Sequence, residues 1–325
     1  MKAEKISYLT KNCRIYKIHI AKSVTTEYDR TCRLVTGFAI RSIEKEYSMD
    51  CDLHIHTINS DGSMSVKDVV YYAYKSGIKN IAISDHDTLA GVAEAMELGK
   101  QFGVRVIPAV EMSVLDKKRN RPVHVLCYFP QNTDLLNSFL QKTLDSRRNQ
   151  KLEMIEKIQK IYPLLELEHI NRYAKNSQSI YESHIMQSLC DLGYSNVAIG
   201  KLMEDLISKK GSCYVPTNYS SVEEMLVVIE QVKGVVVIAH PEEYDSFELA
   251  EELAKAGRID GLELDHPRNG EESRRRIKEL AAAYNLILTG GSDFHGQYTK
   301  QPHPLGSYGC EEKVLEQMEE IIEMK

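Results

Sequence analysis

Histidines and acidic residues gather in two short segments, Asp52–Thr57 and Ser84–Asp87, at the ends of two apolar runs. In the first segment His54 and His56 are two residues apart, and side chains at that spacing point to the same face of a β-strand. Imidazole and carboxylate groups are ligands for divalent transition metals. The pattern therefore indicates a metal site that begins at the end of a strand.

The residues around these segments predict a strand–helix–strand unit. Residues 49–56 and 78–84 are apolar enough for strands, and residues 66–77 have helical spacing with a glycine at the end. Parallel α/β sheets and barrels carry their reactive side chains at the carboxyl ends of the strands. The polar residues at these strand ends are therefore candidates for an active site.

The alternation of strands and helices continues through most of the chain. Further strands are predicted at residues 104–113, 123–129, 234–241, 259–266 and 286–295, of which the first two are expected to form a hairpin. Helices are predicted at residues 88–102, 222–231, 247–256, 271–284 and 311–324, and Asp87 or Thr88 is expected to cap the first of these. Seven strands with intervening helices predict an α/β fold, a closed or nearly closed barrel.

Residues 132–211 interrupt this alternation, because they contain helical patterns and no strand-like run. Helices are predicted at residues 135–161, 181–192 and 197–208. We expect this segment to be a helical insertion, either a lid or a subdomain over the site, within a barrel formed by residues 49–131 and 212–325. Residues 1–48 mix short apolar groups with many charges and are expected to form an N-terminal extension, with a small β-rich unit as one interpretation.

Nine side chains at or just beyond the predicted strand ends, or within the hairpin, are candidates to meet in one cleft. They are His54, His56, Asp61, His86, Glu111, His124, His240, Asp293 and His295. Nine ligands exceed the needs of one tetrahedral ion, so the set predicts two or three divalent ions that share bridging carboxylates. This mixture of ligands suits Mn²⁺, which we favour, and also Zn²⁺ or Fe²⁺.

A site of this kind predicts metal-assisted hydrolysis of a phosphate ester. Ions about 3.5–4 Å apart lower the pKa of a bridging water and neutralise the phosphoryl oxygens, so a metal-bridging hydroxide would attack and no side-chain nucleophile is required. A single histidine at a strand end is more often a surface or hydrogen-bonded residue, and His169 and His303 are interpreted in that way. The nine residues, however, lie together at or near corresponding strand ends or within the hairpin, and this shared position favours a metal site for the whole set.

Composition excludes some other classes of protein. The chain has 325 residues, 42% of them hydrophobic, and a net charge of -6, which argues against a general nucleic-acid binder and predicts no stable nucleic-acid complex. No apolar run of about 18 residues predicts a membrane span, and the N-terminus lacks the apolar core of a signal peptide. The seven cysteines are scattered without a Cys-x-x-Cys pair, which is typical of the reducing cytoplasm.

These motifs together resemble the PHP (polymerase and histidinol phosphatase) family. The resemblance rests on residues 52–57, 60–62, 84–87, 111, 123–125, 239–241 and 292–295 and spans roughly residues 50–300. The order and spacing look most like the stand-alone PHP phosphoesterases, which include nucleotide phosphatases and a 5′-to-3′ exoribonuclease. The resemblance implies a distorted (β/α)7 barrel and a trinuclear metal site held by the nine residues named above.

The chain departs from the family pattern in the predicted insertion. Relatives of the nucleotide-phosphatase type carry Arg-Pro-His near the start of a helix there, and the arginine is thought to help hold phosphate. This chain has Glu182 at the arginine position and keeps the histidine as His184. A carboxylate at that place would repel an anion. The resemblance implies that His184, Lys210 and Tyr214 contact a phosphate or a base, and a solvated pair of lysines, Lys209 and Lys210, is the alternative interpretation.

Five more residues have expected roles beside the metals. Asp85 and Asp87 flank His86 and are expected to orient a ligand or to cap a helix. Asp52 and Glu263 are expected to support the ligands, and the resemblance implies that His266 touches substrate.

The sequence therefore predicts a metal-dependent phosphoesterase that hydrolyses a phosphomonoester of a small metabolite, a nucleotide in our preferred interpretation. An exonuclease on short oligonucleotides is the first alternative. A non-catalytic metal-binding module and a C–N hydrolase are the others, because barrel metal sites support several chemistries.

Overall fold

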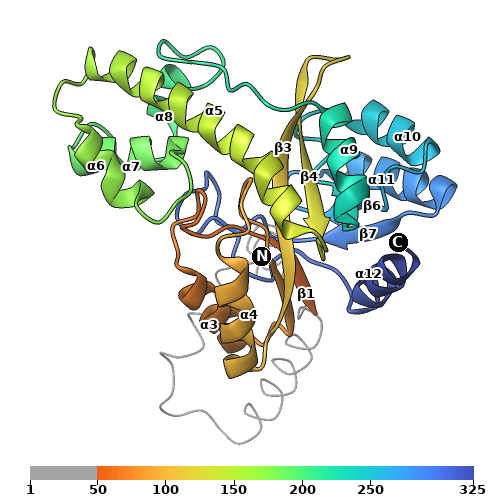
Figure 1. The fold of residues 1–325 in the computed structure, drawn as a ribbon. Coiled ribbons are helices and arrows are strands. Elements are labelled where there is room, and N and C mark those ends of the chain that lie inside the picture. The colour runs from red at the N-terminus through yellow and green to blue at the C-terminus, as the bar shows by residue number, and fades with distance from the viewer. Residues whose placement is uncertain (1–49) are drawn as a thin grey trace, which may run out of the picture. The chain divides into compact units, whose positions relative to one another are not determined.

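One sheet of seven strands runs through the part of the chain that the computed structural model describes, residues 50–325 (Figure 1). In spatial and sequence order the strands are β1 (Cys51–Ile55), β2 (Asn80–Ile83), β3 (Arg105–Asp116), β4 (Arg121–Tyr128), β5 (Val235–Ile238), β6 (Gly261–Asp265) and β7 (Ile287–Gly290). Strand β4 is antiparallel to β3 and β5, and all other neighbours are parallel. The predicted hairpin is confirmed, whereas the expectation for residues 1–48 lies outside the described residues.

The two ends of the sheet meet, so that the sheet is nearly closed into a barrel. Beyond β1, the backbone N–H of His56 donates to the carbonyl of Phe294 at 2.9 Å, and Cys51 exchanges both backbone hydrogen bonds with Cys310. A Cβ atom on Gly291 would lie 2.4 Å from the backbone nitrogen of His54. The backbones therefore approach here without room for a side chain, and the predicted nearly closed α/β barrel is confirmed.

Amphipathic helices cover the outside of the sheet. They are α3 (Val66–Ser76), α4 (Val92–Phe102), α9 (Val222–Val232), α10 (Phe247–Lys255), α11 (Glu271–Tyr284) and α12 (Lys313–Met324). Helix α3 shows why the sequence forms them: the Ser65 side chain accepts from the N–H of Asp68 at the start, and Gly77 ends the helix in the left-handed conformation. Its buried residues recur at helical spacing and pack against β1 and β2.

The prediction that Asp87 or Thr88 caps the second helix is wrong. Helix α4 begins four residues later than predicted, and Gly91 precedes it without a side-chain cap. The backbone of Asp87 is left-handed, with φ 56°, and its carboxylate accepts from the N–H of Ser113 instead. The Asp87 side chain therefore binds a residue distant in the sequence and does not cap the helix that follows it.

Four helices lie between β4 and α9: α5 (Thr133–Gln159), α6 (Leu167–Ala174), α7 (Glu182–Asp191) and α8 (Lys201–Leu206). The first half of α5 packs on the barrel through Leu136, Phe139 and Leu140. Its second half, including Met154 and Ile158, forms another apolar core with α6, α7 and α8. Helix α5 thus connects the two cores, and Figure 1 shows it running from the sheet to the helices α6, α7 and α8.

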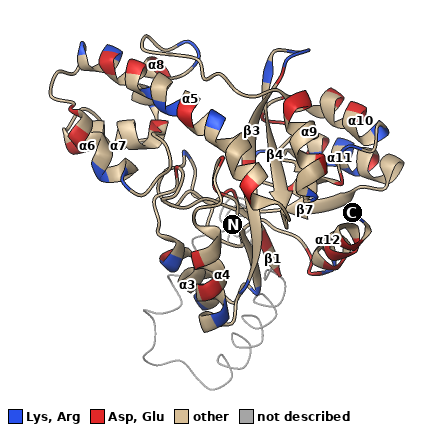
Figure 2. Ribbon diagram, viewed as in Figure 1, with Lys and Arg blue, Asp and Glu red and all other residues tan. Residues whose placement is uncertain are grey.

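Charges of both signs are spread over the outer faces of the helices (Figure 2). On α11, for example, Arg275 pairs with Glu272 and Glu279, all largely exposed. Exposed pairs contribute about 0–1 kcal/mol each, so the apolar cores carry most of the stability. Among the described residues, no helix combines the length and the hydrophobicity needed to cross a membrane.

Substitution of Gly291 tests the closure of the barrel. Gly291→Ala should lower the free energy of unfolding by at least about 2 kcal/mol, because the new methyl group meets backbone atoms of His54. Urea denaturation measures this change. Gly270→Ala is the matched control, since its nearest neighbour would be a glutamate oxygen at 3.4 Å and the effect should be small. Equal stabilities of the two variants would contradict the close approach of β1 and the segment after β7.

Candidate metal centre

The carboxylate of Glu111, in the middle of β3, lies among five imidazole rings. Its Oε2 is 2.9 Å from His86 Nδ1, 3.2 Å from His54 Nε2 and 3.3 Å from His56 Nε2, and its Oε1 is 2.8 Å from His240 Nε2 and 2.9 Å from His124 Nδ1. Glu111 is 1% exposed. Burial alone would raise its pKa, but the surrounding histidines, His124 first among them, hold the pKa of Glu111 well below its usual range. The carboxylate is therefore an ionised group shared by five rings.

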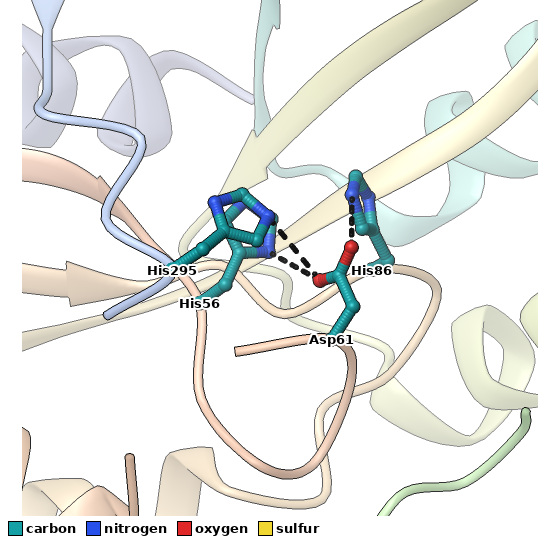
Figure 3. Close-up of side chains that lie close together, drawn as sticks. All are labelled: His56, Asp61, His86 and His295. Carbon is teal, nitrogen blue, oxygen red and sulfur yellow. Dashed lines mark ion pairs between the residues drawn. The ribbon is translucent and has the colours of Figure 1, made fainter. Parts of the chain in front are cut away.

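A second carboxylate, Asp61, faces the same rings from the loop after β1. Its Oδ1 lies 3.3 Å from His295 Nε2 and 3.8 Å from His56 Nδ1, and its Oδ2 lies 3.8 Å from His86 Nε2 (Figure 3). Most of these separations are too long for good hydrogen bonds, yet all four side chains point to one place. Four donors arranged in this way could hold one ion.

Asp293 completes the set from the loop after β7. Its Oδ1 lies 3.3 Å from His56 Nε2 and 3.7 Å from His54 Nε2. The structure thus brings together all nine predicted ligands, in four groups with the geometry to hold an ion: His56, Asp61, His86 and His295; His54, His56 and Asp293; His54, Glu111 and His240; and His86, Glu111 and His124. Because the groups share His54, His56, His86 and Glu111, ions held by them would be neighbours.

The polar atoms of this cluster fit metal ions. Within residues 50–325, seven of its buried side-chain atoms make no hydrogen bond of suitable distance and angle, even where another member of the cluster is as close as 2.9 Å: His54 Nε2, both ring nitrogens of His56, His86 Nδ1, Glu111 Oε2, His240 Nδ1 and His266 Nε2. Buried polar atoms in proteins nearly always have a partner. Imidazole nitrogens and carboxylate oxygens that converge without one are the donor set of a site for divalent transition metals.

Glu263 holds two of the histidines in place. Its Oε1 lies 2.9 Å from His54 Nδ1, so the other ring nitrogen of His54 faces Glu111. Its Oε2 accepts from the backbone N–H of His240 at 2.8 Å. A carboxylate on the far nitrogen of a ligating histidine fixes the ring and its tautomer. The structure therefore places Glu263 where it can support the ligands.

His266 lies beside the metal ligands and not in the open cavity. Its Nδ1 accepts from the backbone N–H of Arg268, so a neutral ring carries its proton on Nε2. That Nε2 is 3.5 Å from Asp293 Oδ2. The ring is fully buried, and this geometry suits it to orient Asp293.

Three buried aspartates fix the loops that carry the ligands. Asp52 accepts from the N–H and hydroxyl of Ser292 at 2.9 and 2.6 Å, next to Asp293. Asp85 accepts from the N–H of Thr57 at 2.7 Å and from the hydroxyl of Ser60 at 2.6 Å, which positions the loop of Asp61. The third, Asp87, joins β3 to α5 through Ser113 and Arg147.

Several of these residues have strained backbones. His240, Asp293 and Asp87 have φ values of 25°, 52° and 56°. The left-handed region is unfavourable for residues other than glycine, and it costs about 1–3 kcal/mol where a side chain must be held in a particular direction. The strain therefore lies at the ends of β2, β5 and β7, where the candidate ligands leave the sheet.

The start of α7 contacts the ligand loops directly. The Tyr181 hydroxyl donates to the carbonyl of His86 at 3.0 Å, and the Ser183 hydroxyl donates to the carbonyl of Asp61 at 3.3 Å. His184 is 1% exposed, its Nδ1 accepts from the N–H of Tyr181, and burial lowers its pKa to about 4. The structure therefore places His184 behind the loop of Asp61, not along the cavity that adjoins the metal centre.

That cavity has a volume of about 1090 Å³. His124 and Tyr244 line it beside the metal centre, and Lys209, Tyr214 and Tyr219 also line it. Of the four residues predicted to bind substrate, Tyr214 is therefore in the cavity wall. Lys210 is exposed and is not among the lining residues.

Two cations on α5 were missed by the sequence analysis. The Arg147 guanidinium donates to Asp87 Oδ2 at 2.7 Å and to the Ser113 hydroxyl at 3.0 Å, and lies 4.7 Å from the centre of the Tyr181 ring. One turn further on, Lys151 is 2% exposed and lines the cavity. Their i, i+4 spacing on the face of α5 that is otherwise apolar was the available signal.

Metal removal provides a test of the centre. Saturating Mn²⁺ should raise the Tm of metal-free protein by about 5–10 °C, because ligand at a hundred times its Kd stabilises the native state by about 2.7 kcal/mol. Glu111→Gln should lose most of this rise, and Glu279→Gln, at an exposed ion pair on α11, should keep it. Differential scanning fluorimetry with and without a chelator measures the shifts. An equal rise in both variants would show that Glu111 is not central to metal binding.

The comparisons with known proteins agree with this geometry. Residues 52–233 match the PHP domain family model. The chain is 32% identical over 253 residues to the phosphoribosyl 1,2-cyclic phosphate 1,2-diphosphodiesterase of Eggerthella lenta, which covers 78% of this chain and 96% of that protein. It is 27% identical over 262 residues to the 5′-3′ exoribonuclease Rnm of Escherichia coli, covering 78% and 87% of the two chains.

A solved structure from Bifidobacterium adolescentis, provisionally described as a metal-dependent phosphoesterase, is also similar. It has a TM-score of 0.78 and 28% sequence identity, over 84% of this chain and 96% of that chain. The family match includes more than half of the present chain, from Asp52 onward, and contains six of the nine candidate ligands. The protein therefore belongs to the PHP domain family.

Proposed function

We propose that the protein is a metal-dependent phosphoesterase that releases phosphate from a phosphomonoester of a small metabolite, with a nucleotide as the preferred substrate. The observation that carries this proposal is the ionised, buried Glu111 among five imidazoles beside a large cavity. The named relatives act on phosphate esters, which supports the same class of reaction.

The proposed ligands are the nine histidine and carboxylate residues around Glu111, and we propose two or three ions, with Mn²⁺ favoured. When bound, such ions polarise phosphoryl oxygens and lower the pKa of water. Glu263 and His266 would orient His54 and Asp293, while Asp52, Asp85 and Asp87 would hold the ligand loops. Tyr181 and Ser183, at the start of α7, would fix the backbone carbonyls of His86 and Asp61.

We further propose that residues 132–211 form a lid over a barrel of residues 49–131 and 212–325. Cavity-lining residues come from both parts, including Lys151 and Met203 from the first and His124 and Arg268 from the second. A substrate in the cavity would therefore be enclosed between them, which excludes water from the reacting phosphate. A cytoplasmic location is also proposed, since all five cysteines of the described residues are free thiols.

Exonuclease activity is the second candidate, because the chain is similar over most of its length to a 5′-3′ exoribonuclease. The net charge of -6 favours a small substrate over a long nucleic acid. Release rates from a mononucleotide and from a short 5′-phosphorylated oligonucleotide separate the two. Faster turnover of the mononucleotide supports the proposal, and faster turnover of the oligonucleotide would favour the exonuclease.

Substitution of a candidate ligand tests the reaction class. Metal-loaded protein should hydrolyse p-nitrophenyl phosphate, and His54→Ala should lower kcat by about 1000-fold or more, since it removes a metal ligand from the reacting site. His169→Ala is the control and should keep wild-type activity, because His169 lies on α6, where it helps to cap that helix. Full activity of His54→Ala, or of protein stripped of metal, would overturn the proposal.

A further inference from the structure

An ion pair in the cavity wall exposes its two members unequally. Lys151 Nζ lies 2.6 Å from Glu182 Oε1, and both residues line the cavity. The lysine side chain is 2% exposed, whereas the glutamate side chain is 31% exposed. The ammonium group is therefore covered, and a molecule in the cavity meets the carboxylate first.

This carboxylate remains ionised. Burial raises the pKa of Glu182, but the charge of Lys151, with Arg147 beside it, lowers the pKa further than burial raises it. Glu182 is also the first residue of α7, and the positive end of a helix stabilises a negative charge there. An ionised carboxylate only accepts hydrogen bonds, so this part of the wall suits a group that donates them.

The same wall disfavours a second phosphate group. A phosphate brings negative charge and acceptor oxygens toward another acceptor, and the repulsion is strong where water is scarce. Lys151 lies behind Glu182 and offsets only part of its charge toward the cavity, and its 2% exposed side chain offers a ligand little donor surface. A hydroxyl-bearing part of the substrate fits this position better than an anionic part.

We propose that Glu182 accepts hydrogen bonds from the vicinal hydroxyls of a ribose and so selects nucleoside 5′-phosphates whose 2′ and 3′ hydroxyls are free. The two oxygens of one carboxylate can accept from two adjacent hydroxyls, and acidic residues bind ribose hydroxyls in this way elsewhere. Three tyrosines in the cavity, Tyr214, Tyr219 and Tyr244, offer aromatic faces for a base. This inference rests on the proposed phosphatase function and names its substrate class.

Substrate comparison tests the inference. For wild-type protein, kcat/KM for adenosine 5′-monophosphate should exceed that for 2′-deoxyadenosine 5′-monophosphate and for adenosine 3′,5′-bisphosphate by about tenfold or more, as expected for a hydrogen bond to a charged group. Glu182→Gln should reduce both ratios severalfold, mainly through a higher KM for the monophosphate. Glu153→Gln is the matched control: Glu153 lies on α5, 55% exposed, paired with Lys157, and its loss should leave both ratios unchanged.

A second variant guards against misfolding, because Glu182→Gln leaves Lys151 buried without its partner. The double variant Lys151→Met, Glu182→Gln removes the whole pair and should show the same reduced ratios. Equal kcat/KM values for the three substrates in wild type, or ratios that neither variant changes, would overturn the inference. Failure of wild type to hydrolyse p-nitrophenyl phosphate with metal would instead overturn the phosphatase function itself.

Discussion

The structure depends on one buried charge, the carboxylate of Glu111. A lone carboxylate that is 1% exposed would be strongly unfavourable, and here five imidazole rings compensate it. The rings come from β1, from the ends of β2 and β5, and from β4, so the charge is satisfied only when the sheet is assembled in this order. Because β3 is long and lies between β2 and β4, its central residue Glu111 can reach histidines from both neighbouring strands. The fold and the candidate metal centre therefore specify each other.

Around this centre, buried carboxylates hold loops and histidines in directions that the backbone alone would not adopt. Asp52 and Asp85 each accept several hydrogen bonds from ligand loops, and Glu263 contacts both His54 and the backbone of His240. These contacts offset the strain at left-handed residues such as His240. Helix α5 adds Arg147 and Lys151 from the stretch between its two apolar cores. Arg147 binds Asp87, next to His86, and Lys151 binds Glu182 in the cavity wall, so one helix contacts both the ligand loops and the cavity.

Local sequence predicted the seven strands, the hairpin and the nine residues that meet, because strand ends and the two-residue period place side chains without knowledge of long-range contacts. It failed where tertiary partners decide. Asp87 looks like a helix cap in the sequence, but Arg147, sixty residues away, takes its carboxylate. The inward direction of Lys151 and the burial of His184 depend on how α5 and α7 pack. A helical pattern that contains charged residues does not predict that packing.

In the sequence, the charge of Glu182 looks unfavourable for binding a phosphate. What this residue presents to the cavity also depends on how α5 and α7 pack. Its partner Lys151 is on another helix and is covered, so the cavity presents a hydrogen-bond acceptor at this position. In the function and substrate class that we propose, the reaction would depend on the barrel residues around Glu111, and the choice of substrate would depend on the helical segment that carries Glu182. Anomalous diffraction from crystals soaked in Mn²⁺ tests the first of these most directly. We expect at least two peaks within bonding distance of the histidines around Glu111, with Glu111 as a ligand to one or more of the ions. The absence of any peak there would contradict a metal centre built on this carboxylate.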